Sequence, residues 1–549
     1  MIFSFGCNNN VNEKTSYLQK IEIENNISYD QILNTRGSYI TSMCYTMTQD
    51  ESLESVSNPC YSCHTKGIIP NYYNDSPLQE SYNFPPEMMK NPFSNLFKDR
   101  SIRVSQISDE EIWTYVRQSN YIDEKGNILL ADRLPKDWEG YIPDCYFNFD
   151  SEGFDRDING NYTLWRAFRY YPFLGTFWPT NGSMDDVLIR LDQNFAMSED
   201  GQLDIEVYKL NLAIVESVVK QKDINLSVTV DEVQYGVDLN QNGILDSSSI
   251  VVVATYDQMS YVGMAKKLLE EKKIHLALGL YPENTEFLHS VRYIDWDENL
   301  GRIVLSKRMK ELRYAKKYEW NSYSAIARTA LTETKEAIVN GTDEAVLATF
   351  RGDYEYGLNN EIGWIYQGFI EDKNGLLRPQ THEETINCMG CHSHLGSTTD
   401  STFAFARKFE GIDPDANDYG WNHWTQKGLK GIKEPLISYF NYGEQYEYSF
   451  YLQNNHSGNE FRNNQEVQEK FFHSDGSVKQ DMLEALHQDI SLLLFPSKER
   501  ALELNKGYKT LVEEQSFIYG RDANVLPMEN VYTKIQAEQS TQIEQVIVR

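Results

Sequence analysis

The alternation of apolar and polar residues predicts strands in the middle of the chain. Two segments, QLDIEVYKL (202–210) and NLSVTVDEV (225–233), change between apolar and polar residues at nearly every step, as half-buried strands do. The segment SIVVVATY (249–256) is a short apolar run rich in valine, which indicates a buried strand. We therefore expect a β-containing middle domain and assign residues 131–320 to it.

Other segments have apolar residues at helical spacing. A helix should begin at Ser108, because Ser108 and Glu111 can form a capping box and Ile107 and Ile112 a hydrophobic staple. The longest helical patterns lie later in the chain, and we assign a helical C-terminal extension to residues 441–549. These patterns are SAIARTALTETKEAI (324–338), DMLEALHQDISLLLF (481–495) and KERALELNKGYKTLVEEQ (498–515).

Length and charge restrict the class of protein. A chain of 549 residues can form several domains and bury a large core. It contains no apolar run long enough for a membrane-spanning helix. The formal charge of −30 repels nucleic acid and would attract a partner with a basic surface. We therefore expect no nucleic-acid partner and no transmembrane helix.

One short motif occurs twice and carries most of the chemical information. The chain reads CYSCH at residues 60–64 and CMGCH at residues 388–392. C-x-x-C-H is the attachment motif of c-type haem, in which two thiols bind one edge of the porphyrin and the histidine binds the iron. A four-cysteine zinc site or a thioredoxin-like redox motif is the alternative, but neither explains a histidine after both cysteine pairs.

These two motifs and their short flanks resemble those of the c-type cytochromes. The resemblance implies two covalent haems, held by Cys60, Cys63, Cys388 and Cys391 through thioether bonds and by His64 and His392 as proximal iron ligands. It also implies the fold class, which we predict to be α+β and multidomain, with mostly helical cytochrome c-like haem modules around a β-containing middle domain. The modules would occupy residues 37–130 and 321–440.

The sixth iron ligands are harder to assign. Class I cytochromes c supply a methionine after the attachment site, which suggests Met88 or Met89 for the first haem, although methionine also fills gaps in apolar cores. No methionine follows the second motif at the usual distance. His423, which lies between two tryptophans in GWNHWTQKG, is our candidate there. Alternatively, the second iron keeps an open position.

The middle domain contains a candidate calcium loop, DLNQNGILD. Asp238, Asn240 and Asn242 provide alternating oxygen donors, Ile244 would provide its backbone carbonyl, and Asp246 completes the set. Calcium requires several oxygen ligands, and the glycine at position 243 permits the sharp bend. A polar turn has the same composition, so this alternative stays open.

The N-terminus MIFSFGCNNN resembles the end of a lipoprotein signal, in which a small residue precedes a cysteine that becomes lipid-modified. We therefore interpret residues 1–36 as a truncated export or lipoprotein signal with a linker, and Cys7 as a lipid anchor. A cytosolic N-terminus is the alternative. Export would permit a disulfide between Cys44 and Cys145, although both are equally plausible as buried free thiols.

Together these patterns predict an exported dihaem c-type cytochrome in the periplasm or on the outer surface of a bacterial cell. It would transfer electrons between a redox protein donor and an acceptor. Two alternatives stay open. One is a dihaem peroxidase or oxidase with an open coordination position on the second iron. The other is a haem-containing redox sensor or binding protein, since much of the chain lies outside the haem motifs.

Overall fold

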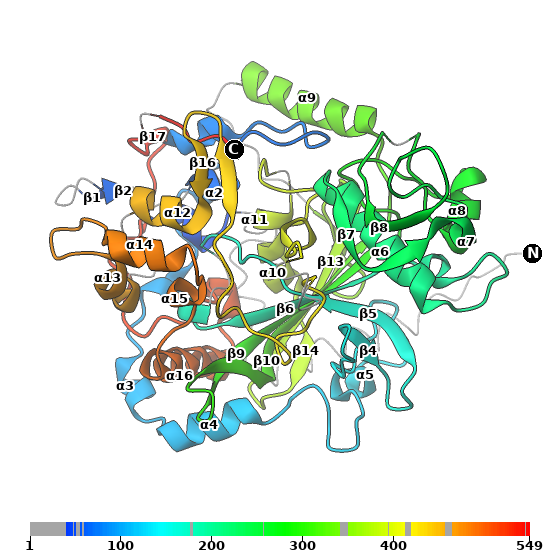
Figure 1. The fold of residues 1–549 in the computed structure, drawn as a ribbon. Helices are drawn as coiled ribbons and strands as arrows, with labels where there is room; N and C mark the ends of the chain where they lie inside the picture. Colours follow the sequence, from blue (N-terminus) through cyan, green and yellow to red (C-terminus); the bar gives the residue numbers. More distant parts are fainter. Residues whose placement is uncertain are drawn as a thin grey trace, which may run out of the picture.

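A large antiparallel sheet runs through the centre of the protein (Figure 1). The computed structural model describes residues 40–47, 49–50, 55–56, 60–175, 179–255, 257–340, 350–393, 395–411, 419–455, 464–543 and 545–549. Within these ranges the sheet has nine strands. In spatial order they are β11 (Arg351–Asp353), β12 (Gly357–Asn359), β13 (Trp364–Glu371), β10 (Arg302–Lys317), β9 (Glu286–Asp297), β6 (Met184–Arg190), β5 (Tyr162–Phe168) and β4 (Phe154–Arg156), and β14 (Leu377–Pro379) pairs with β13.

This sheet contradicts the predicted fold class. We expected mostly helical haem modules around a β-containing middle domain, but the sheet joins strands from residues 154–379 into one body. It therefore includes residues on both sides of the predicted boundary at residue 320. The strands β9 and β10 are long and form an antiparallel pair from Asp297 and Arg302 to Glu286 and Lys316, with shifts of register around Met309. The protein is a mixed α/β structure built on an antiparallel sheet.

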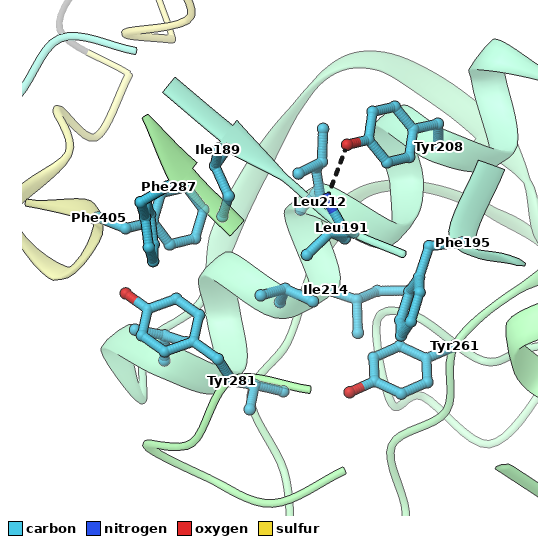
Figure 2. Packing of buried hydrophobic residues seen from close by; sticks show 14 of the residues in the cluster. Ile189, Leu191, Phe195, Tyr208, Leu212, Ile214, Tyr261, Tyr281, Phe287 and Phe405 are labelled. Atoms are coloured by element: carbon cyan, nitrogen blue, oxygen red, sulfur yellow. Dashed lines mark hydrogen bonds between the residues drawn. The ribbon is translucent and has the colours of Figure 1, made fainter. Parts of the chain in front are cut away.

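A buried helix packs against one face of the sheet and forms the largest apolar cluster. This helix is α6 (Ile205–Lys220), and most of its residues are buried. Figure 2 shows Leu212 and Ile214 of α6 near Ile189 of β6 and Phe287 of β9. The Tyr208 hydroxyl accepts a hydrogen bond from the Leu191 backbone N–H at 3.0 Å.

The helix α6 also shows that one predicted strand was wrong. Residues 202–210 alternate, yet from Ile205 onwards they belong to α6. Asp204 caps the helix, because its carboxylate accepts from the backbone N–H groups of Glu206 and Val207. Because α6 is buried on nearly every side, it has no continuous polar face. Its apolar residues therefore do not show the 3.6-residue period of a helix over one or two turns.

The other two predicted strands exist. The segment 225–233 lies largely in β7 (Ile224–Asp231), and the start of 249–256 forms the end of β8 (Ser247–Val251). The two strands pair with each other outside the central sheet. Beside them in Figure 1 lie α7 (Glu232–Tyr235) and α8 (Gly263–Glu270).

The predicted helices are confirmed with small changes. The helix expected from Ser108 is α4 (Asp109–Arg117), capped by the Ser108 side chain. The segment 324–338 lies in α9 (Tyr323–Asn340), and 498–515 is α16 (Lys498–Glu514). The segment 481–495 forms two helices, α14 (Gln480–Leu486) and α15 (Ser491–Leu494). Both α4 and α16 contact β9 and β10.

The remaining elements are short. The helices are α2 (Cys60–Cys63), α3 (Ser101–Ser105), α5 (Leu129–Arg133), α10 (His382–Thr385), α11 (Met389–His392), α12 (Glu447–Asn455) and α13 (Gln465–Phe471). The strands are β1 (Gln49–Asp50), β2 (Ser55–Val56), β3 (Ser81–Tyr82), β15 (Leu436–Tyr439), β16 (Gly443–Tyr446) and β17 (Gln539–Ser540). Within the described ranges, no helix combines the length and apolarity needed to cross a bilayer.

Candidate functional site

The two C-x-x-C-H motifs lie next to each other, although more than 300 residues separate them in sequence. The loops that follow them are joined by hydrogen bonds. Asn71 donates from its amide to the carbonyl of Leu395 at 2.8 Å, and the backbone N–H of Ser397 donates to the carbonyl of Cys63 at 3.2 Å. The Gly396 N–H donates to the Asp75 carboxylate at 3.1 Å. The fold therefore builds one site from both motifs.

In the first motif, the carboxylate of Asp75 orients His64. The motif cysteines lie on α2, and the His64 N–H continues the turn by donating to the carbonyl of Cys60 at 2.8 Å. The Nδ1 atom of His64 is 3.2 Å from Asp75 Oδ2. Although burial favours the neutral ring, hydrogen bonds with Asp75 and Cys44 raise the pKa of His64 to about 9. When Nδ1 donates to Asp75, the second ring nitrogen, Nε2, points away from this carboxylate.

In the second motif, a backbone carbonyl has the same role. The Nδ1 atom of His392 donates to the carbonyl oxygen of Ser401 at 3.0 Å. Because a carbonyl only accepts, Nδ1 must carry the proton and Nε2 keeps its lone pair. Burial lowers the pKa of His392 to about 4, so the ring is neutral near pH 7. A neutral imidazole whose Nδ1 is held in this way is the usual form of a histidine metal ligand.

The second motif faces a cavity of about 310 Å³ above the central sheet. Cys388, Cys391 and His392 line one side. The sheet forms the floor through side chains at alternate positions of β6, β9 and β10, which point to the same face. These floor residues are Asp185, Val187, Phe287, His289, Val291, Glu311, Arg313 and Ala315.

The polar part of this sheet cavity is positively charged at one end. Glu311 contacts Arg313 at 2.9 Å and Arg521 at 2.8 Å, so two guanidinium groups share one carboxylate. Although burial alone would raise it, the two arginines lower the pKa of Glu311 to about 2. Arg313 is also close enough to Cys388 to influence the pKa of that thiol. This end of the cavity suits a ligand with carboxylate groups.

Several polar atoms around the sheet cavity have no partner. Among the described residues, no group hydrogen-bonds the Asn181 amide, the Tyr508 hydroxyl or Nε of Arg521, and all three are buried. All three residues line the cavity. Buried polar atoms in native proteins almost always have a partner, so these three groups are available to a polar ligand in the cavity.

A second polar group lies on the sheet floor. Nε2 of His289 is 3.0 Å from Asp185 Oδ2, and the Tyr170 hydroxyl donates to the same carboxylate oxygen. The sequence analysis did not select these residues. His289 lies in phase with Phe287 and Val291 in an alternating strand, and this pattern could have identified it as a residue of the buried face.

The structure places the candidate sixth ligands away from this cavity. His423 is buried, with Nε2 2.5 Å from Asp186 and Nδ1 2.9 Å from the Thr425 hydroxyl. Both of its ring nitrogens are hydrogen-bonded and His423 does not line the sheet cavity, so its role as a sixth iron ligand stays a prediction that this arrangement does not support. Met88 is buried in an apolar cluster with Tyr45, as in the core-filling alternative. Neither Met88 nor Met89 lines the sheet cavity.

The disulfide between Cys44 and Cys145 does not form. Both thiols are free. Cys44 lies within hydrogen-bonding reach of His64, beside the first motif. Cys145 is fully buried in a different apolar cluster, with Tyr121 and Trp165. The two cysteines therefore match the free-thiol alternative.

We expect Asp75 to be important for stability, because its carboxylate accepts from His64, from the Thr65 N–H at 2.8 Å and from Gly396. Asp75→Ala should lower the free energy of unfolding by about 2–3 kcal/mol, since it leaves partly buried donors without an acceptor. Urea denaturation measures this change. Glu80→Ala, at an exposed position nearby, should change stability by less than about 0.5 kcal/mol. A loss below about 1 kcal/mol for Asp75→Ala would show that the joined loops do not depend on this carboxylate.

The candidate calcium loop is closed around Asp238, whose Oδ2 accepts from the Gly243 N–H at 2.8 Å. Asn240 and Asn242 both direct their amides to the carboxylate of Asp246. The side chains of Asp238, Asn240, Asn242 and Asp246 therefore converge, and Ile244 follows in the same loop. Within the described ranges, no three His, Cys, Asp or Glu side chains group to hold a metal. Calcium at this loop of two aspartates and two asparagines stays a prediction.

Calcium should raise the melting temperature if the loop binds it. At a free concentration one hundred times the Kd, a bound ion stabilises the native state by about 2.7 kcal/mol. Calorimetric scans in calcium chloride and in a chelator measure the shift. Asp246→Asn should remove it, and magnesium at the same concentration should not reproduce it. Equal melting temperatures in calcium and chelator would identify the segment as a polar turn.

Comparisons with known proteins give a consistent result. A family model described as a lipoprotein matches residues 34–490. An uncharacterized lipoprotein of Aquifex aeolicus (strain VF5) is 33% identical over 527 residues, which cover 87% of this chain and 84% of the relative. No solved structure matches the chain at a significant level.

These findings contradict the resemblance to the c-type cytochromes, because the matched family and relative are described as lipoproteins and not as cytochromes c. The resemblance rested on two five-residue motifs, whereas the family match covers most of the chain. The predictions of a dihaem electron carrier, of a dihaem peroxidase or oxidase, and of a haem-based redox sensor are therefore wrong. The predicted redox protein partner loses its support with them.

Proposed function

Since the chain belongs to this family of lipoproteins and is therefore a lipid-anchored extracytoplasmic protein, we propose that its sheet cavity holds a covalently attached haem. Cys388 and Cys391 would form the thioether bonds, and His392 would bind the iron. A second haem would be attached at the first motif, to Cys60 and Cys63, with His64 on its iron. The protein is then a haem-binding lipoprotein.

The observation that carries this proposal is the state of the two motif histidines. Both are held at Nδ1, by the carboxylate of Asp75 and by the carbonyl of Ser401. A histidine held at Nδ1 turns Nε2 towards a possible metal, and in the neutral ring of His392 this nitrogen keeps the lone pair that an iron ligand requires. In each motif the histidine also follows a helical turn that brings its two cysteines to one side.

The sheet cavity supports the second motif in particular. Its apolar floor residues Phe287 and Val291 suit a flat, apolar ring. The end formed by Arg313 and Arg521 suits the two carboxylates that haem carries, and Nε of Arg521 has no partner among the described residues. Haem supplies an iron whose properties depend on the protein groups around it. On the sheet floor, His289 and Asp185 provide a group that can hold or move a proton.

We also propose Cys7 as the residue that carries the lipid. Cys7 lies outside the described residues. The family identifies the protein as a lipoprotein but does not distinguish the periplasm from the outer cell surface. In either location the protein lies outside the cytoplasm, and the haem would be attached there. This agrees with the chemistry of the C-x-x-C-H motif.

Covalent attachment is tested on the mature full-length protein, produced in a host that attaches haem to C-x-x-C-H motifs. After denaturation in acid, organic solvent extracts only non-covalent haem. We expect the colour to stay with the protein and the intact mass to increase by two haems. Cys388→Ala/Cys391→Ala and Cys60→Ala/Cys63→Ala should each lose one haem. The control Cys145→Ala should keep both, because Cys145 is buried in a different cluster.

The outcomes separate the two sites. Extraction of all colour into the solvent, with no mass added to the protein, would overturn the proposal. A single haem that disappears only in Cys388→Ala/Cys391→Ala would restrict the proposal to the sheet cavity. A haem lost in Cys145→Ala would contradict the assignment of the motif cysteines.

A further inference from the structure

Arg166 is a buried cation without an anionic partner. Its residue is only 5% exposed, on strand β5. Its Nε donates to the carbonyl oxygen of Glu152 at 3.1 Å. Among the described residues, no carboxylate lies within ion-pair distance of its guanidinium, and no group accepts a hydrogen bond from its two terminal nitrogens. A buried charge of this kind is costly unless something pairs with it.

The guanidinium is nevertheless held firmly in place. It lies 4.4 Å from the ring of Phe154 and 4.0 Å from the ring of Trp421, so two aromatic groups fix its plane. The neighbouring lysines are occupied. Lys209 contacts Glu152 at 2.7 Å, and Lys408 contacts Glu216 at 2.9 Å. Of these three cations, Arg166 is the one for which no carboxylate partner occurs among the described residues.

Arg166 faces a cavity of about 250 Å³ that shares no lining residue with the sheet cavity. One wall is the strand β7, whose alternate residues all line it. These residues form an apolar stripe, which consists of Ile224, Leu226, Val228 and Val230. Ile224 is buried and Leu226 and Val230 pack against the main apolar cluster, whereas Val228 is 58% exposed, so the stripe is open to a ligand at Val228.

We propose that this cavity binds a small aliphatic carboxylate. The carboxylate would accept two parallel hydrogen bonds from the terminal nitrogens of Arg166, because the guanidinium fork matches a planar carboxylate. The aliphatic chain would lie along the apolar stripe of β7. Burial that lowers the pKa of Arg166 to about 10 agrees with a cation that lacks a partner. The inference does not depend on the proposed haem.

Calorimetric titration of the full chain with octanoate tests the proposal. Octanoate should bind about tenfold more tightly than hexanoate, because two more methylene groups are buried. Octanol, which lacks the charge, should bind at least tenfold more weakly than octanoate. Inorganic phosphate, which has no chain for the stripe, should not compete.

Two variants and one control locate the site. Arg166→Met should reduce octanoate affinity at least thirtyfold without lowering the melting temperature, since it removes an unpaired buried charge. Val228→Asp, at an exposed position, should weaken binding at least tenfold. Arg156→Met should leave affinity within twofold, because Arg156 is paired with Asp150 at 2.7 Å and does not line the cavity.

The proposal is overturned if octanoate does not bind, or if Arg166→Met binds it as tightly as the unmodified chain. Phosphate that competes with octanoate would identify an inorganic-anion site and would also overturn it. A folded Arg166→Met protein with a lower melting temperature and unchanged affinity would assign Arg166 a purely structural role. If Arg166→Met fails to fold, unchanged affinity in Val228→Asp is sufficient to reject the proposal.

Discussion

Replacing Glu384 by alanine is expected to lower the free energy of unfolding by about 3–5 kcal/mol. Glu384 binds Arg378 through two parallel hydrogen bonds of 2.8 and 2.9 Å, and both side chains are almost fully buried. Glu384 also caps α10 by accepting from the Thr381 N–H at 2.8 Å. Because α10 leads directly into Cys388, the change should also loosen the second motif.

We expect the loss of stability to be large because the Arg378–Glu384 pair is buried, and an exposed ion pair provides the matched control. Arg351 and Glu361 form an ion pair whose side chains are 86% and 52% exposed. Arg351→Gln should therefore change stability by less than about 1 kcal/mol. Urea denaturation measures both variants. A loss below about 1 kcal/mol for Glu384→Ala would mean that the buried pair contributes no more than an exposed one.

The pH dependence of the same pair has a defined sign. Although burial alone would raise it, Arg378 lowers the pKa of Glu384 below its ordinary value. A carboxyl whose folded-state pKa is lowered stabilises the protein above its unfolded pKa of about 4.3 and loses this effect as the pH falls through the folded pKa. The difference between Glu384→Gln and the unmodified chain should be full at pH 6–7 and shrink below pH 4. A difference that stays constant from pH 7 to pH 3 would contradict this.

The sequence predicted the helices whose capping and spacing signals lie within a few neighbouring residues. The N-cap at Ser108 and the helical pattern of residues 498–515 both appear in the structure. The motif residues Cys388 and His392 were also visible, because the motif is contiguous. The pairing of the two motifs was not visible, since it depends on contacts such as Asn71 to Leu395 that join distant parts of the chain.

The central sheet was missed for a different reason. Strand β10 reads RIVLSKRMKELRYAKK, and this density of charge does not suggest a buried strand. Lys310, Glu311 and Lys317 are nevertheless almost fully buried, because partners from distant segments satisfy them. Arg521, for example, pairs with Glu311 from beyond α16. A pattern read along one segment cannot reveal a charge that is compensated by another segment.

A tight turn after the second motif fixes the orientation of His392. Its central residues, Asp400 and Ser401, have φ angles of 48° and 61°, a conformation that is costly for residues other than glycine. Backbone hydrogen bonds of 3.0 Å join Thr399 and Thr402 in both directions. The carboxylate of Asp400 pairs with the buried Lys317 and accepts from the Tyr281 N–H at 2.9 Å. The turn thereby directs the carbonyl of Ser401 to His392.

Lys317→Met should therefore destabilise the protein by about 3–5 kcal/mol, because it leaves the Asp400 carboxylate buried and without its cation. The double variant Lys317→Met/Asp400→Asn should recover at least half of this loss, since asparagine tolerates a positive φ and carries no charge. Urea denaturation gives the stabilities, and the NMR signals of the His392 ring report whether Nδ1 keeps its proton. If Lys317→Met loses 3 kcal/mol and the double variant recovers none of it, the lysine acts through packing on Trp364 and not through Asp400.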